Sequence, residues 1–270
     1  MNCALIGTTK IAEVHLFELI KIGAKKITII SRNLDKGKKL CMKSKLKFPK
    51  INFYFSKKKI LKEKKFDLID ICTSNSSHDL YLKYIDKSDA IILIEKPIIS
   101  LKKFRYNYKK ILHYIYKNNK KVIVCYPMIY LAKNFKKYFK NKKLENTFDF
   151  IFETGGRYKG EFINIDLMPH AISFISSFFH HKVLYKKDLE IKEIKVTKNK
   201  WLSRFSIGKI NFLIKLCEKN KKKTSLTIKY NNKKIIRGTK IIKNKFLNFL
   251  TYKKKVQIIK NPMSEFFKDL

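Results

Sequence analysis

The alternation of strand-like and helix-like segments in the first half of the chain is the feature that most restricts its fold. Short apolar or β-branched runs predict strands at residues 4–6, 27–30, 51–55, 66–72, 90–94 and 122–124. Apolar residues at helical spacing predict helices between them, at residues 11–22, 35–43, 77–85 and 101–116. Strands that alternate with helices indicate an α/β fold with a doubly wound parallel sheet, as in the Rossmann fold.

The pattern changes after Tyr126, where strands follow one another with few helices between them. Strands are predicted at residues 148–152, 189–196, 210–216, 225–230 and 256–259, and a short helix is expected to start at Asp166. Consecutive strands of this kind indicate a mainly antiparallel sheet. We therefore expect two domains, a Rossmann domain over residues 1–125 and an α+β domain over residues 126–270 that ends in a short helix.

The formal net charge of +42 raises the question of a nucleic-acid partner. Only five of the 63 basic residues are arginines, however, whereas base readout and phosphate forks favour arginine. Lysine is accompanied by abundant Ile, Asn, Phe and Tyr, all of which have A/T-rich codons, so the charge is better explained by nucleotide bias. We expect a solvated basic surface that can attract a phosphorylated substrate, and nucleic-acid binding is disfavoured.

The cysteines and the apolar runs bear on the cellular setting. Five cysteines are scattered without C-x-x-C spacing, which argues against a disulfide framework or a zinc site and for a reducing compartment. The apolar run Ile91–Ile94 is far too short to span a membrane. The interpretation is a cytoplasmic protein with buried, packing cysteines, no structural metal and no membrane partner.

The first predicted strand runs into Gly7–Ala12, where a dinucleotide-binding fold has its phosphate turn. Gly7 and Ala12 occupy the first and third positions of the glycine fingerprint, and Thr9 replaces the second glycine. An ordinary strand-to-helix turn is the alternative interpretation. The position between the first strand and the first helix favours the phosphate turn.

The end of the second predicted strand carries Ser31, Arg32 and Asn33. An NAD-binding chain normally places a carboxylate there for the ribose, whereas an arginine suits the 2′-phosphate of NADP. The sequence therefore favours NADP, with NAD as the alternative.

Several segments follow one another in the order and spacing of one enzyme family. They are residues 4–12, residues 71–78 with their Thr-Ser-Asn and His, Glu95-Lys96-Pro97, residues 166–170 and residues 261–267. Together they resemble the Gfo/Idh/MocA oxidoreductases, named for glucose–fructose oxidoreductase and inositol dehydrogenase. The resemblance implies that the second domain is built on an open sheet and binds the substrate. It further implies that copies of the chain associate into a dimer or tetramer through this domain. It also implies hydride exchange between a nicotinamide and a carbinol or carbonyl carbon of a sugar, sugar nucleotide or cyclitol.

The chemistry of hydride transfer gives the family residues distinct roles. Lys96 follows a buried strand at the carboxyl edge of the sheet, where its ammonium can donate to the substrate oxygen and partial burial would lower its pKa. Pro97 fixes that turn, and the resemblance suggests a cis peptide. His170 can supply the proton, with Asp166 one turn earlier on the same helix face. Capping the helix is the alternative role for Asp166, and a core or capping position is the alternative for His170.

The expected cofactor contacts combine the phosphate turn, the end of the second strand and the family segments. His78 among them has a structural role as its alternative. The complete set is Gly7, Thr8, Thr9, Lys10, Ile11, Ser31, Arg32, Asn33, Thr73, Ser74, Asn75, His78, Glu95, Lys96 and Pro97.

Some positions depart from the family pattern. Thr9 and Met168 replace family glycines, and Ser173 stands where the family often has an aspartate. A non-catalytic nucleotide-binding sensor or assembly subunit of the same fold therefore stays open as a second hypothesis. A nucleic-acid-binding protein is a third hypothesis, supported only by charge.

Overall fold

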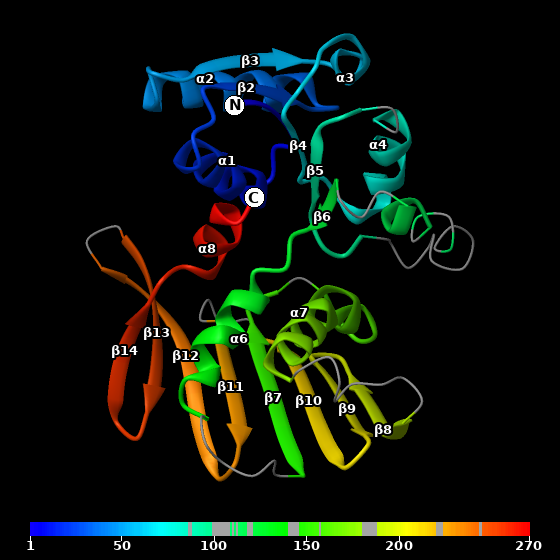
Figure 1. Ribbon diagram of the computed structural model, residues 1–270, viewed down its shortest axis with the longest axis vertical. Coiled ribbons are helices and arrows are strands. Elements are labelled where there is room, and N and C mark those ends of the chain that lie inside the picture. Colours follow the sequence, from blue (N-terminus) through cyan, green and yellow to red (C-terminus); the bar gives the residue numbers. More distant parts are fainter. Residues whose placement is uncertain are drawn as a thin grey trace. The chain divides into compact units, whose positions relative to one another are not determined.

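The computed structural model describes residues 1–85, 88–98, 109, 111, 113–117, 121–139, 146–156, 158–179, 188–219, 224–242 and 245–270. The chain divides into two units (Figure 1). The first comprises Met1–Cys125 together with Phe267–Leu270, and the second comprises Tyr126–Phe266. The final helix, α8 (Pro262–Lys268), crosses this division.

The first unit contains a parallel sheet with the strand order β3-β2-β1-β4-β5-β6 (Figure 1). The order reverses between β1 and β4, which creates the switch point where α/β sheets bind ligands at the carboxyl ends of their strands. The strands are β1 (Asn2–Ile6), β2 (Lys26–Ile30), β3 (Asn52–Ser56), β4 (Leu68–Ile71), β5 (Ile91–Ile94) and β6 (Val122–Val124). The helices between them are α1 (Lys10–Lys21), α2 (Leu34–Lys47), α3 (Ile60–Glu63), the 3₁₀ turn η1 (Asn75–Ser77) and α4 (His78–Tyr84).

Side-chain caps explain where the first two helices begin. Thr9 Oγ1 accepts a hydrogen bond from the backbone N–H of Ala12 at 3.4 Å, and Asn33 Oδ1 accepts one from Lys36 at 2.9 Å. Such caps satisfy backbone donors that have no partner within the helix. All six predicted strands of this unit are confirmed with small shifts at their ends, and α2 runs four residues further than predicted, to Lys47. The helix predicted at residues 101–116 lies largely outside the described residues.

The second unit contains an eight-stranded sheet with the order β14-β13-β12-β11-β7-β10-β9-β8 (Figure 1). Only β7 and β10 pair in parallel, and the other described pairs are antiparallel. The strands are β7 (Thr147–Thr154), β8 (Leu189–Thr197), β9 (Lys200–Ile207), β10 (Ile210–Glu218), β11 (Ser225–Tyr230), β12 (Lys233–Ile242), β13 (Lys245–Tyr252) and β14 (Lys255–Ile259). The α/β class, with a parallel sheet and a mainly antiparallel sheet, is therefore confirmed.

The helices α6 (Met128–Lys136) and α7 (Phe162–Phe178) pack on one face of this sheet (Figure 1). Phe148, Phe150 and Phe152 alternate along β7 and point to that face, where all three are buried. The ring of Phe174 on α7 lies 5.5 Å from that of Phe150, in an edge-on arrangement typical of aromatic cores.

Two sequence expectations for this unit are wrong. The helix expected to start at Asp166 starts at Phe162, and it continues through Pro169 because tertiary packing of its apolar face outweighs the proline penalty. The strands β9, β12 and β13 and the helix α6 were not predicted. The turn between β13 and β14 consists of Lys253 and Lys254, both with positive φ, and lysines give no turn signal in a sequence. Among the described residues no helix is long and apolar enough to cross a membrane.

Candidate active site

A cavity of about 570 Å³ lies at the carboxyl edge of the parallel sheet. It brings together three segments that the sequence analysis assigned to the cofactor: the first turn, the end of β2 and the end of β4. Ile30, Lys36 and Tyr81 also line it, and the sequence analysis did not include them. The lining residues are Gly7, Thr8, Thr9, Ile30, Ser31, Arg32, Asn33, Lys36, Thr73, Ser74 and Tyr81.

Gly7 is the one position in the phosphate turn where a side chain has no room. Its φ is 129°, and a Cβ built there would lie 2.7 Å from the carbonyl oxygen of Cys72. The backbone N–H of Gly7 donates to the carbonyl of Ile30 at 2.9 Å, so the pairing of β1 with β2 continues into the turn. Thr9 replaces the second glycine of the fingerprint but keeps α1 capped, with its N-terminus beside the cavity. Unpaired N–H groups at such a terminus favour bound phosphate.

The end of β2 supplies the cationic part of the cavity. Arg32 and Lys36 are exposed and line it, and Ser31 beside them is buried. No lining residue among those described carries a carboxylate. The side chain of Asn33 caps α2. Arg32 and Lys36 are therefore the side chains that can bind an anion at this end of the cavity.

His78 does not line the cavity but connects two loops behind it. Its ring nitrogens lie 3.0 Å from the carbonyl oxygen of Thr73 and 3.2 Å from that of Ile98. Burial lowers the pKa of His78 despite these two carbonyls, so the neutral ring donates to one of them. These contacts fit the structural alternative for His78.

Lys96 lies two residues beyond the end of β5, and its peptide bond to Pro97 is cis, as the family resemblance suggested. The backbone N–H of Glu95 donates to Ile71 at 3.0 Å and continues the pairing of β5 with β4 beyond the strand end. Lys96 and Pro97 are partly buried, while Glu95 is buried. Lys96 therefore lies at the same edge of the sheet as the cavity, although neither it nor Lys10, Ile11, Asn75, Glu95 or Pro97 lines the cavity.

Beneath this edge lies a buried ionic network that the sequence analysis missed. His15 on α1 is fully buried, and its Nδ1 lies 2.9 Å from Asp70 Oδ2 while its Nε2 lies 3.0 Å from Glu95 Oε1. The ring of Phe267 meets the imidazole edge-on at 5.0 Å. A histidine on the buried face of a helix and an aspartate inside an apolar strand were the available signals, because charged groups are rarely buried unless they are paired.

The protonation of this network follows from its contacts. Burial on its own would lower the pKa of His15, but the charge of Asp70 and their hydrogen bond raise that pKa well above its usual value. Burial also opposes ionisation of Glu95, yet the hydrogen bond and charge of His15 hold the pKa of Glu95 below its usual value. The network is therefore an imidazolium held between two carboxylates.

Two buried thiols complete the surroundings of His15. Cys72 Sγ lies 3.0 Å from Nδ1, and Cys125 Sγ lies 3.8 Å from Nε2. With the carboxylates they form two triads of metal-ligand type that share the imidazole. Burial raises the pKa of Cys125 to about 12 and that of Cys72 well above its usual value, so both thiols stay protonated. In the metal-free protein, the proton on His15 therefore lies between the two carboxylates.

In the second unit, Asp166 and His170 lie one turn apart on α7. The ring of His170 meets that of Phe152 on β7 edge-on, with ring centres 5.6 Å apart. Asp166 is an interior residue of the helix, so the alternative that it caps α7 is wrong. His170 thus belongs to the second unit and Lys96 to the first.

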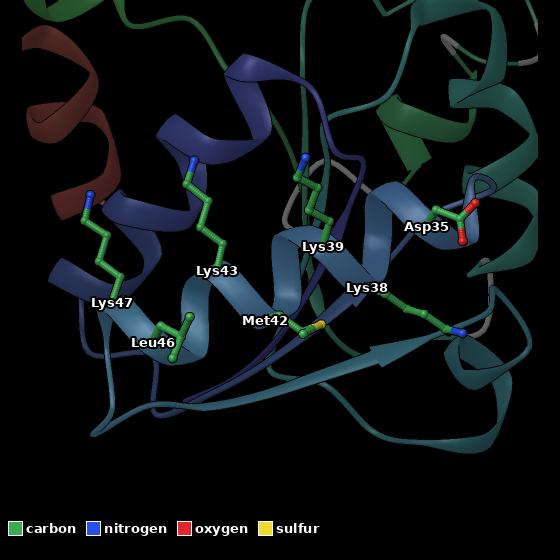
Figure 2. A pocket seen from close by; sticks show the side chains of 7 residues that line it. All are labelled: Asp35, Lys38, Lys39, Met42, Lys43, Leu46 and Lys47. Atoms are coloured by element: carbon green, nitrogen blue, oxygen red, sulfur yellow. The ribbon is translucent and has the colours of Figure 1, made fainter.

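A second hollow, of about 730 Å³, runs along the outward face of α2 (Figure 2). It contains none of the predicted site residues. Figure 2 shows its lining side chains along this single helix: Asp35, Lys38, Lys39, Met42, Lys43, Leu46 and Lys47. A face made of one helix with four lysines and no converging polar groups lacks the features of an active site.

Comparisons with known proteins relate the first unit to one family. Residues 1–126 match the model of the Gfo/Idh/MocA family, described as an oxidoreductase family with an NAD-binding Rossmann fold. No match was found among curated proteins.

Solved structures match over the length of the chain. A dehydrogenase from Clostridium difficile is 14% identical, with a TM-score of 0.68 over 100% of this chain and 88% of that chain. A 3-ketoreductase from Actinomadura kijaniata, in complex with NADP and TDP-benzene, is 10% identical, with a TM-score of 0.69 and the same coverage. An oxidoreductase from Agrobacterium radiobacter, in complex with NAD+, L-tartaric acid and magnesium, is 14% identical, with a TM-score of 0.65 over 99% of this chain and 85% of that chain. These likenesses show the shared fold, and residues 1–126 match the NAD-binding Rossmann fold of the Gfo/Idh/MocA oxidoreductases.

Proposed function

We propose that the protein is an NADP-dependent oxidoreductase that transfers a hydride between the nicotinamide and a carbinol or carbonyl carbon of a small polar substrate, a sugar, sugar nucleotide or cyclitol. The observation that carries the proposal is the cavity between the Gly7 turn and the end of β2, which offers a helix N-terminus and two cations but no carboxylate. The catalytic lysine expected from the family pattern follows β5 at the same edge of the sheet.

The residues of the first unit suit the parts of this cofactor. The N-terminus of α1 suits the pyrophosphate, since its backbone donors meet the cavity beside Gly7. Arg32 and Lys36 suit a 2′-phosphate, which a carboxylate at this position would repel. Bound NADP supplies or accepts the hydride, and the protein supplies binding and orientation.

Lys96, His170 and Asp166 are the proposed catalytic residues. The Lys96 ammonium donates a hydrogen bond to the substrate oxygen, where negative charge develops as a carbonyl is reduced. His170 delivers the proton to that oxygen, or removes it in the oxidative direction. Asp166 is one helical turn from His170 on α7, where it can help to orient the imidazole. Residues 126–270 would then form the substrate-binding domain.

We also expect a homo-oligomer. The edge strand β8 exposes four large apolar side chains, Leu189, Ile191, Ile194 and Val196. An apolar edge of this kind favours association with another chain. Light scattering coupled to size-exclusion chromatography would show a dimer or tetramer, and a monomer at every concentration would contradict this expectation.

Cofactor binding provides the test of the proposed function. Purified protein is titrated with NADPH and with NADH, and reduced-nicotinamide fluorescence is followed. We expect tighter binding of NADPH, and Arg32→Ala should remove that preference. Lys38→Ala is the matched control, because Lys38 lines the separate hollow on α2 (Figure 2). Absence of binding by either nucleotide would refute the proposal, and equal affinities in wild type would refute the choice of NADP.

A further inference from the structure

Arg237 lies among fully buried apolar residues on the helix-covered face of the second sheet. In the strand register it is paired with Leu226 on β11 and Leu250 on β13, and both leucines are completely buried. Because directly paired residues point to the same face, Arg237 points to the face where α6 and α7 pack. A long cationic side chain at such a position is unusual in a sheet interior.

The guanidinium of Arg237 is poorly satisfied where it lies. One terminal nitrogen, Nη2, donates to Asn248 Oδ1 at 2.5 Å. Its Nε is buried and has no acceptor among the described residues, and none of the described carboxylates forms an ion pair with Arg237. Burial lowers the pKa of Arg237 to about 10, which still leaves it charged at neutral pH. Arg237 is partly exposed, but its Nε is buried, and a largely desolvated cation without an anion among the described residues is costly; an anionic group would satisfy it.

The strand register also places Arg237 near the proposed proton donor. Phe152 is paired with Leu226, which is paired with Arg237, so two strand spacings of about 4.8 Å each separate Phe152 from Arg237. His170 packs on the ring of Phe152 from the same face. Arg237 and the residue on which His170 packs therefore lie on one face of the sheet, two strands apart.

We propose that Arg237 binds an oxyanion of the substrate, a carboxylate or a phosphate, and that Asn248 orients the guanidinium for it. The substrate is then an anionic hydroxy or keto compound, whose reacting carbon meets His170 while its anionic group meets Arg237. The paired oxygens of a carboxylate or a phosphate suit the donors that Arg237 leaves unused. This inference rests on the proposed function, because it takes His170 to mark the reacting end of the substrate.

The test measures anion binding by the full-length protein with isothermal titration calorimetry, with and without NADPH. The probes are L-tartrate for the carboxylate and inorganic phosphate for the phosphate. We expect one probe to bind at a single site, and Arg237→Met to weaken that binding by at least about tenfold. Arg204→Met is the matched control, because Arg204 is an exposed arginine on β9 paired with Glu193. It corrects for loose anion binding to a chain of net charge +42.

Arg237→Lys keeps the positive charge but loses the forked pair of guanidinium N–H donors, and we expect it to bind the probe with intermediate affinity. It also serves as the test variant if Arg237→Met does not fold. Equal binding by wild type, Arg237→Met and Arg204→Met would overturn the proposal, and so would the absence of single-site binding for both probes. NADPH titration of the same samples separates this failure from that of the proposed function, since cofactor binding should survive every variant at Arg237.

Discussion

Replacing His15 by glutamine should destabilise the first unit strongly. The substitution removes the imidazolium that lies 2.9 Å from Asp70 and 3.0 Å from Glu95, two carboxylates that are 0% and 7% exposed. Removing one partner of a buried ion pair costs about 3–5 kcal/mol, because the remaining charge is left without compensation. At about 2–4 °C per kcal/mol, the unfolding temperature of the variant should fall by roughly 10 °C at pH 7.

The pH dependence gives the reasoning a second, sharper test. The pKa of His15 is raised in the folded protein, so its stabilisation is complete below pH 6.5, its ordinary value, and is lost as pH rises through the raised value. The pKa of Glu95 is lowered in the folded protein. Its contribution to the free energy of unfolding is therefore complete above pH 4.5, its ordinary value, and is lost as pH falls through the lowered value. The difference between wild type and His15→Gln should therefore be largest between about pH 5 and 6.5 and shrink on either side.

Thermal unfolding followed by circular dichroism across this pH range is the assay. His113→Gln is the matched control, because His113 is an exposed histidine of the same unit. An unfolding temperature of His15→Gln within about 2 °C of wild type at pH 6, or parallel pH curves for the two proteins, would refute the charged network.

Two further perturbations test the local structure. Gly7→Ala should weaken NADPH binding at least about tenfold, because a Cβ at Gly7, whose φ is 129°, would lie 2.7 Å from the Cys72 carbonyl oxygen. Gly23→Ala is the control for backbone strain alone, since Gly23 has a φ of 96° but no atom within 4 Å of a built Cβ. Equal NADPH affinity of the two variants would contradict the clash. All five cysteines are free and buried, and burial raises the pKa of Cys3 and Cys125 to about 12, so a thiol-reactive dye should label none of them in the native protein and all five after denaturation in guanidinium. Rapid native labelling of Cys72 or Cys125 would show that the network is open to solvent.

The parallel sheet was predictable because its inner strands β1, β2, β4 and β5 are largely buried on both faces and therefore appear in the sequence as continuous apolar runs. Ile27–Ile30 and Ile91–Ile94 illustrate this, since β-branched residues dominate both. The second sheet was harder to predict. Its strand β12 begins with two lysines, and the turn that follows β13 is made of lysines, so neither alternation nor turn chemistry marks their boundaries.

The cavity lining was predicted where it follows a local motif, as with Gly7 or Arg32. The rest of the site was missed where its chemistry depends on strand register. Ile71 pairs with Ile94, which sets Cys72 beside Glu95, and only then can one imidazole on α1 reach both Asp70 and Glu95. Arg237 likewise gains its meaning from its pairing with Leu226, which no local pattern reveals.

The most direct test of hydride transfer is the oxidation of NADPH in the presence of a panel of keto-sugars, keto-acids and their phosphorylated forms. We expect wild type to oxidise NADPH with at least one member of the panel. Lys96→Ala and His170→Ala should each lose at least about a hundredfold in kcat while they bind NADPH as tightly as wild type does. Undiminished oxidation by Lys96→Ala, or firm NADPH binding without oxidation across the panel, would contradict the account and favour a nucleotide-binding sensor.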